Sequence, residues 1–545
     1  MIDSAPAPEI SAVGFANGSD DATSAPGTAQ PPPEPTPARP LGDIALSLSG
    51  GGYRAAGFHL GVLGFLHGVG LLPSVAALST VSGGSIVGAA WVVSVLDGKA
   101  FGEFSEGFRA FLLRTNVIRE ALRHVAGHRR HGELEWPSLI RSAARIYAAP
   151  DFLGDRKFGE LFDARLPLRE MIFNSTEFRT GVDFRFRRSD NAQARIGNGN
   201  VWMRRDVADH VRLADIVAAS SCFPGAFEPI RFPDDFAWPA DFPLDEARQK
   251  LGPMFDGGLP LMDGGIYDNQ GVDSLVLAYN RGAAATLLIS DTSPRQESLF
   301  TYPPARKPGW VTIRMVSILG WLLFALAAGS LSVLAGNARQ HWKGGLHDWL
   351  LYVVPALLAL GTVAGLAWLR HRVVMGAAAA RSQIHIEHLW KDIRNLTVAE
   401  AAGMAELRAA SMLALTSSVF MKRIRGLIYD NVFQDKRFDH RRMACLIYGL
   451  EESRPKLFAK YPWLRPNPKL VAEAQKAEGM ATTLWFDDPS QLARLERVGA
   501  ATICFVLIKF ILEDRAEYAA IPGSPVALLL ERLKAEWGKI NGVNA

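Results

Sequence analysis

The chain has 545 residues, 48% of them hydrophobic, and a formal net charge of +4. This length is enough for two or three domains, and the nearly balanced charge argues against a nucleic-acid-binding protein. The three cysteines, Cys222, Cys445 and Cys504, form no pairable framework, which indicates reduced thiols and a cytosolic compartment.

Residues 1–40 contain no apolar segment, and the stretch 31–40 is largely proline. We expect a disordered tail there and not a secretory signal peptide. Strand-like and helix-like patterns then alternate, which predicts a three-layer α/β/α domain with a mostly parallel central sheet over residues 41–305. Strands are expected near Ile44–Leu48, Ala77–Val81, Met171–Asn174, Val182–Phe186 and Thr286–Ser290.

Three consecutive glycines, Gly50, Gly51 and Gly52, stand between the first expected strand and an apolar helical run that begins near Ala55. Glycines at such a junction let successive backbone N–H groups point into one small space, and the helix N-terminus adds partial positive charge. The loop can therefore hold a phosphate or a developing oxyanion.

Two other interpretations of the glycine loop fit less well. A Walker phosphate loop ends in Gly-Lys-Ser/Thr, and no lysine follows these glycines. The spacing of Gly50, Gly52 and Ala55 matches a dinucleotide fingerprint, but that site needs an acidic residue about twenty positions on. No Asp or Glu occurs between Asp43 and Asp97.

Ser82 lies between a short β-prone run and an apolar run, Ile86–Val95, that suits a helix, with Gly83 and Gly84 directly after it. A serine on a sharp strand-to-helix turn is a nucleophile elbow, in which the hydroxyl projects from the top of the sheet. Thr80 replaces the first glycine of the Gly-x-Ser-x-Gly pattern, so an ordinary Ser/Gly turn is the alternative.

An Asp-Gly-Gly sequence occurs twice, at Asp263 and, seven residues earlier, at Asp256. Glycines after an aspartate let the chain turn sharply beside it and leave room for a substrate. We expect one of the two to be a turn aspartate that bonds only its own backbone.

Together these segments resemble the patatin-like phospholipases. Residues 49–54 are similar to the family's oxyanion loop, Ser82-Gly83-Gly84 to its nucleophile elbow, and Asp263-Gly264-Gly265 with Asn269 to its Asp-Gly-Gly signature. Segments 173–181 and 218–227 agree with two further family blocks. The departures are Thr80, Gln270-Gly271 in place of the usual Asn-Pro, and the doubled Asp-Gly-Gly.

The resemblance implies a lipid acyl hydrolase of the phospholipase A or lysophospholipase type that needs no metal or other cofactor. Ser82 would attack the acyl carbonyl of a membrane lipid ester, and Asp263, the copy with the fuller family match, would take its proton. N–H groups of Gly50, Gly51 and Gly52 would hold the oxyanion. Since an ordinary aspartate has a pKa of about 3.9 and is a weak base, this loop would carry much of the catalysis.

Two other functions stay open, an acyltransferase on the same fold and a non-catalytic membrane scaffold. The presence of Ser82, the glycine loop and Asp263 together favours an enzyme, because a scaffold needs none of them. Arg54 either binds a lipid phosphate or caps the glycine loop. His59 and His67 fall on the apolar helical run, where packing or surface roles are expected and a catalytic triad is not.

The helix-prone stretch 104–147 carries eight arginines among apolar residues: Arg109, Arg114, Arg119, Arg123, Arg129, Arg130, Arg141 and Arg145. It predicts either a basic amphipathic cap that lies on anionic headgroups or a solvated helical cap.

Two uncharged runs, Met315–Gly336 and Trp349–Leu369, lie within residues 310–372. Each is close to the roughly 20 residues that a spanning helix needs, which predicts a transmembrane hairpin, with buried core helices as the alternative. The outer flanks are more basic than the loop between the runs, which places the catalytic domain and the C-terminus in the cytoplasm. The flanking residues are Arg306, Lys307, Arg314, Arg370, Arg372 and Arg381, and the loop holds Arg339 and Lys343.

Residues 373–545 are predicted to be helical and to pack on the catalytic domain. Helices are expected over Ala377–Val398, Ala401–Ile428 and Phe438–Leu450. The apolar run Arg494–Leu512 contains Lys509 and is predicted to be a packed helix and not a third span.

Overall fold

The computed structural model describes residues 35–128, 138–295, 309–341, 345–358, 395–415 and 419–542, and single residues at 302, 343, 360, 361, 364, 365 and 368. The chain divides into two compact units, one of residues 1–297 and 416–545 and the other of residues 298–415. Most of the predicted tail, 1–34, lies outside the described residues, as do residues 377–394 of one predicted helix.

Within the described residues of the first unit, ten strands form one sheet with the main order β10-β9-β1-β2-β3-β4-β5-β6. The neighbouring strands from β10 to β3 are parallel, and β4 and β8 are antiparallel to β3. The five strands predicted from sequence all form, and the expectation of a mostly parallel central sheet is confirmed. The strands are β1 (Ile44–Leu48), β2 (Val75–Val81), β3 (Glu170–Glu177), β4 (Val182–Ser189), β5 (Ile196–Gly197), β6 (Trp202–Met203), β7 (Ile230–Phe232), β8 (Leu259–Asp263), β9 (Thr286–Asp291) and β10 (Arg442–Leu446).

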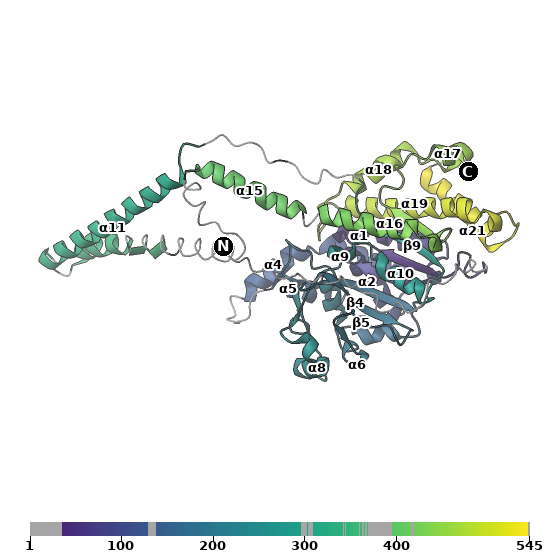
Figure 1. The fold of residues 1–545 in the computed structure, drawn as a ribbon, viewed down its shortest axis with the longest axis horizontal. Helices are drawn as coiled ribbons and strands as arrows, with labels where there is room; N and C mark the ends of the chain where they lie inside the picture. Colours follow the sequence, from purple (N-terminus) through teal and green to yellow (C-terminus); the bar gives the residue numbers. More distant parts are fainter. Residues whose placement is uncertain are drawn as a thin grey trace, which may run out of the picture. The chain divides into compact units, whose positions relative to one another are not determined.

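Helices cover both faces of the sheet, because its central strands are apolar on both sides. The larger core packs α1 (Gly52–Gly68), α2 (Gly83–Leu96), α3 (Phe101–Arg114), α5 (Leu139–Tyr147), α7 (Leu213–Ser220), α19 (Pro489–Asp514) and α21 (Pro525–Asn541). The opposite core packs α10 (Val272–Asn280) and α16 (Phe420–Gln434). α19 packs against α1, and Figure 1 shows α21, in yellow, beside α19. The remaining helices of this unit are α4 (Val117–His128), α6 (Arg205–Ala208), α8 (Leu244–Leu251), α9 (Gly265–Asp268), α17 (Pro455–Lys460), α18 (Pro468–Glu478) and α20 (Ala516–Ala519).

The C-terminal region contributes a strand as well as helices. The predicted helix over Phe438–Leu450 is wrong: β10 joins the sheet parallel to β9, with Ala444 opposite Ile289. Met443 and Cys445 are buried and alternate with more exposed neighbours, which is the period of a strand. So short an apolar run does not distinguish a strand from a helix by periodicity. The run Arg494–Leu512 lies in α19, which is largely buried, so the prediction of a packed helix is confirmed.

The second unit contains α11 (Ile313–His341), α12 (Leu346–Asp348) and α15 (Val398–Ala414). Over Ile313–Gln340, α11 is long and apolar enough to cross a membrane, and its most apolar window is not buried within the chain. The second predicted span corresponds in the described residues to a shorter apolar helix, Leu346–Leu358. Most of the basic flanking residues lie outside the described part.

Candidate active site

The register of the sheet brings Ser82 and Asp263 together. β2 runs parallel to β3 and ends with Val81 opposite Asn174, directly before Ser82. β8 runs the other way along the same edge of β3 and ends with Asp263 opposite Ser175. The carboxyl ends of β2 and β8 therefore meet head to head on β3, and the two residues lie at the junction.

Ser82 occupies a strained turn between β2 and α2, with φ 50° and ψ −117°. Residues other than glycine rarely adopt a positive φ, and among those described only His440 shares it. A Cβ on Gly83 would clash with the Gly52 carbonyl oxygen, so α2 can begin directly beside the start of α1. Two helix N-termini thus bring partial positive charge close to the Ser82 side chain.

Burial raises the pKa of Asp263 to about 6, opposed by hydrogen bonds from the Ser82 side chain and the Gly265 N–H. The Gly265 N–H lies 2.7 Å from Asp263 Oδ1, and both Ser82 and Asp263 are buried. The expectation of an ordinary, weak aspartate base is therefore revised. A carboxylate with this pKa is still mostly ionised at pH 7 and accepts a proton more readily than an exposed one.

The glycine loop crosses the junction within contact distance of Ser82. A Cβ on Gly50 would lie 3.2 Å from Ser82 Cβ and would clash with the Asn269 side chain. The Gly50 N–H donates to the Asn269 carbonyl oxygen at 2.9 Å, which corrects the prediction that all three glycines present N–H groups to an oxyanion. Gly51 and Gly52 stay as the candidates.

Gly51 and Gly52 both have positive φ, 135° and 56°. A Cβ on Gly51 would lie 2.8 Å from Thr292 Oγ1, and one on Gly52 would clash with the Thr483 carbonyl oxygen. Glycine is therefore required at both positions by backbone conformation and by space. The loop is enclosed by segments far from it in sequence, after β9 and before α19.

A network of side-chain hydrogen bonds supports the Ser82 turn. Ser220 Oγ accepts the Ser82 N–H at 3.1 Å and donates to the Asn174 carbonyl oxygen at 2.7 Å. Asn174 Nδ2 donates to the Thr80 carbonyl oxygen at 2.9 Å, which ties β3 to the end of β2. Thr176 Oγ1 donates to the Asp263 carbonyl oxygen at 2.8 Å. Ser220 and Asn174 lie in the two family-like segments, but the sequence assigned them no role.

Two residues that depart from the family pattern, Thr80 and Gly271, make specific contacts in the structure. Thr80 Cγ2 would lie 2.8 Å from a Cβ on Gly88, so the methyl group of Thr80 uses the space that this glycine leaves in α2. Thr80 Oγ1 also accepts a hydrogen bond from Ser85 Oγ at 3.0 Å. Gly271 has φ 66°, and its carbonyl oxygen accepts the Ser79 hydroxyl at 2.7 Å.

The remaining titratable candidates from the sequence are Asp256, His59 and His67. Asp256 is exposed, and the two histidines pack against neighbouring residues. Asp256 follows a short turn before β8. His59 is buried between Ser290 Oγ and the Ser49 carbonyl oxygen, and burial lowers its pKa to about 4. His67 stacks on Phe101. The packing roles expected for both histidines agree with these contacts.

Arg54 is buried, and its guanidinium group contacts the C-terminal segment. Its Nη1 donates to the carbonyl oxygens of Met480, at 2.7 Å, and Glu478, at 3.2 Å, at the end of α18. The neighbouring Tyr53 N–H donates to the Thr483 carbonyl oxygen at 2.7 Å. Of the two roles left open for Arg54, these contacts favour the structural one, in which it fastens the glycine loop to the C-terminal segment.

We expect Arg54→Ala to lower kcat on a soluble short-chain ester about tenfold, roughly 1.4 kcal/mol, with little change in KM. The reason is that the glycine loop would lose one of its attachments to the C-terminal segment, whereas substrate affinity would not depend on Arg54. Arg54→Lys, which can still reach one carbonyl oxygen, should recover part of the rate. A normal kcat on the short ester with a raised KM for phospholipid would instead show that Arg54 binds the lipid phosphate.

Among the described residues, no three His, Cys, Asp or Glu side chains are grouped to hold a metal ion. The fold and the junction thus define an α/β protein with a serine at a strained strand-to-helix turn beside a buried aspartate. The sequence pattern of the patatin-like phospholipases matches residues 46–276, so the chain carries a patatin-like phospholipase domain.

No curated protein matches the chain. Among solved structures, human GIVD cytosolic phospholipase A2 is similar, with 13% identity and a TM-score of 0.29. The alignment covers 48% of this chain and 50% of that one, so this chain spans about half of the other protein's length. The patatin-like phospholipase domain is assigned from the sequence match over residues 46–276.

Proposed function

We propose that the protein hydrolyses acyl esters of membrane lipids, as a phospholipase A or lysophospholipase, with Ser82 as nucleophile and Asp263 as base. The observation that carries the proposal is the head-to-head meeting of β2 and β8 on β3, because it joins these two side chains in a buried site. The hydrogen bond between them is the one through which the serine proton would leave.

In the first half of the reaction, Ser82 Oγ attacks the acyl carbonyl carbon and its proton passes to the Asp263 carboxylate. The N–H groups of Gly51 and Gly52, next to the starts of α1 and α2, would stabilise the negative charge that develops on the carbonyl oxygen. Collapse of the tetrahedral intermediate breaks the ester bond, and Asp263 returns the proton to the departing alcohol.

In the second half, water attacks the acyl-serine carbonyl carbon while Asp263 again accepts a proton. The fatty acid leaves when the bond to Ser82 Oγ breaks, and Asp263 returns that proton to the serine. Because one carboxyl group acts as base and as acid in turn, a pKa near 6 suits it better than an ordinary one.

The direct test is to incubate the purified full chain with phospholipid and lysophospholipid and to identify the products by mass spectrometry. We expect free fatty acid in amounts that match the lysolipid or the glycerophospho-alcohol formed. Acyl groups recovered on a second lipid without free acid would indicate the acyltransferase. No turnover of any ester and no reaction with a fluorophosphonate would support the scaffold.

We further propose that residues 310–372 anchor the protein in a membrane by two spans, with the catalytic domain and the C-terminus facing the cytoplasm. In support, α11 exposes large apolar side chains such as Trp321, Leu326 and Val333, all at least 60% exposed. A helix this apolar and uncovered would be stabilised by lipid.

The anchor predicts that alkaline carbonate leaves the full chain in the membrane pellet. A reporter placed between Asn337 and Asp348 should be protected on the side opposite a reporter at the C-terminus, because two spans return the chain to its starting side. Release by carbonate would contradict the anchor. Reporters on the same side would contradict the position of the loop across the membrane.

A further inference from the structure

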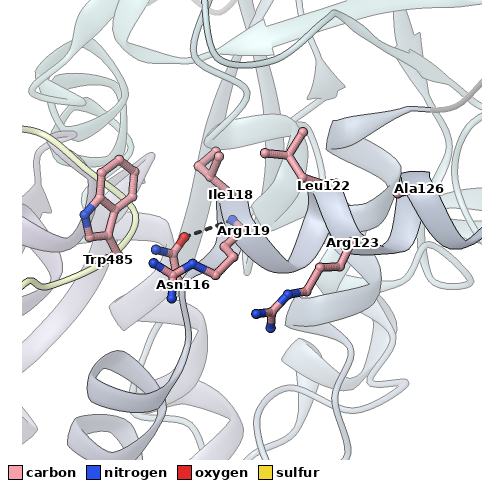
Figure 2. A pocket seen from close by; sticks show the side chains of 7 residues that line it. All are labelled: Asn116, Ile118, Arg119, Leu122, Arg123, Ala126 and Trp485. Carbon is pink, nitrogen blue, oxygen red and sulfur yellow. Dashed lines mark hydrogen bonds between the residues drawn. The ribbon is translucent and has the colours of Figure 1, made fainter.

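A pocket of about 430 Å³ lies between α4 and Trp485. Ile118, Leu122 and Ala126 of α4 supply its apolar wall, and Arg119 and Arg123 also line it. Figure 2 shows Ile118 and Leu122 on one side of α4 and the two arginines on another, with Trp485 across from them. Leu122 is 52% exposed, so the pocket opens to the surface.

The two arginines differ from their neighbours in charge pairing. Arg109 pairs with Glu496 at 2.7 Å, and Arg114 pairs with Asp151. Within the part of the chain that the structure describes, neither Arg119 nor Arg123 has an acidic partner. Unpaired cations beside uncovered apolar side chains match the chemistry of a phospholipid, whose acyl chains are apolar and whose phosphate is anionic.

The pocket is also connected to the glycine loop. The Val117 N–H donates to the Leu484 carbonyl oxygen at 3.2 Å, which fixes the start of α4 to the segment that holds Trp485. Residues on both sides of Trp485 contact Tyr53, directly after the glycines. Thr483 accepts the Tyr53 N–H, and the Phe486 ring lies 5.5 Å from the Tyr53 ring.

We propose that this pocket docks on a bilayer that contains anionic phospholipid, with Arg119 and Arg123 on headgroup phosphates and Leu122 and Trp485 at the acyl boundary. This inference rests on the proposed function, because it takes the bilayer as the source of the lipid substrate. The stretch 104–147 is predicted from sequence to be either a headgroup-binding cap or a solvated cap. The proposal favours the headgroup-binding cap and assigns this role to α4 alone. Each arginine near an anionic surface contributes a favourable interaction that salt weakens.

The experiment uses the full chain with Ser82→Ala, so that docking is measured without turnover. Leu122→Cys carries an environment-sensitive fluorophore, and the native cysteines, all buried, do not compete for the label. The protein is reconstituted with phosphatidylcholine alone or with an equal mixture of phosphatidylcholine and phosphatidylglycerol. Quenching by lipids with brominated chains reports the docked fraction.

We expect strong quenching only in the anionic mixture, lost at high salt. Arg119→Gln with Arg123→Gln should weaken docking about thirtyfold, the equivalent of about 2 kcal/mol for two charges. Arg204→Gln with Arg248→Gln, which removes two exposed arginines elsewhere, should leave it unchanged. Circular dichroism melts of each variant check that the fold is kept.

Equal quenching in both lipid compositions, or in the variant without Arg119 and Arg123, would overturn the proposal. Loss of quenching on addition of inorganic phosphate at constant ionic strength would indicate a site for soluble anions instead. The result is independent of catalysis. If the wild-type chain hydrolyses no ester, the proposed function fails while docking stands, and hydrolysis without docking removes only this inference.

Discussion

Ser82→Ala should reduce kcat for lipid ester hydrolysis by at least about 10³-fold, roughly 4 kcal/mol, and should abolish labelling by a fluorophosphonate. The reason is that Ser82 is the residue at the strained turn between β2 and α2, where its side chain is hydrogen-bonded to Asp263. The fold should survive, because the Ser82 N–H that Ser220 holds is a backbone group and stays in the variant. Kinetics on a short-chain ester and mass spectrometry of the labelled peptide measure both effects.

Ser85 provides the matched control for Ser82. It lies three residues along, is also buried, and its hydroxyl bonds Thr80 and Ser220 within the turn. Ser85→Ala should lower activity modestly and should leave the fluorophosphonate on Ser82. If the label persists in Ser82→Ala and moves to Ser85, the nucleophile has been assigned to the wrong serine.

Asp263→Asn should lower kcat at least about a hundredfold, roughly 2.7 kcal/mol, because an amide cannot accept the serine proton. For the wild type, kcat/KM should rise with pH through about 6, the pKa of Asp263, and then level off, since only the ionised carboxylate is a base. The variant should lose this acidic limb. Asp256→Asn, at the exposed second Asp-Gly-Gly, should retain both the rate and the limb.

Stability separates loss of chemistry from loss of fold in Asp263→Asn. The folded-state pKa of Asp263 lies above its unfolded value, so the ionised form destabilises the native state at neutral and alkaline pH. The amide removes that cost and can still accept the Gly265 N–H. The melting temperature at pH 8 should therefore equal or exceed that of the wild type, with the difference vanishing below about pH 4. A large drop in melting temperature, or full activity, would contradict the role of Asp263.

The sequence by itself identified the serine turn, the glycine loop, the Asp-Gly-Gly signature and five strands of the sheet. Each is a local pattern. A β-prone run followed by glycines and a helical run predicts a strand-to-helix turn. Neighbouring residues are enough for this prediction, because the preferences of turns and helix starts are local. α11 is also predicted from local sequence, because its length and apolar composition do not depend on any tertiary contact.

Only the tertiary structure decided how the site is held together. Arg54 donates to carbonyl oxygens more than 420 residues away, and the Gly50 N–H donates to Asn269, so both hold the glycine loop to distant segments. β10 and the enclosure of Gly52 by Thr483 likewise join distant segments. The pKa of Asp263 is raised by burial, which depends on tertiary packing. Such long-range pairings and desolvation arise from packing, and no local pattern encodes which distant backbone group will meet a given side chain.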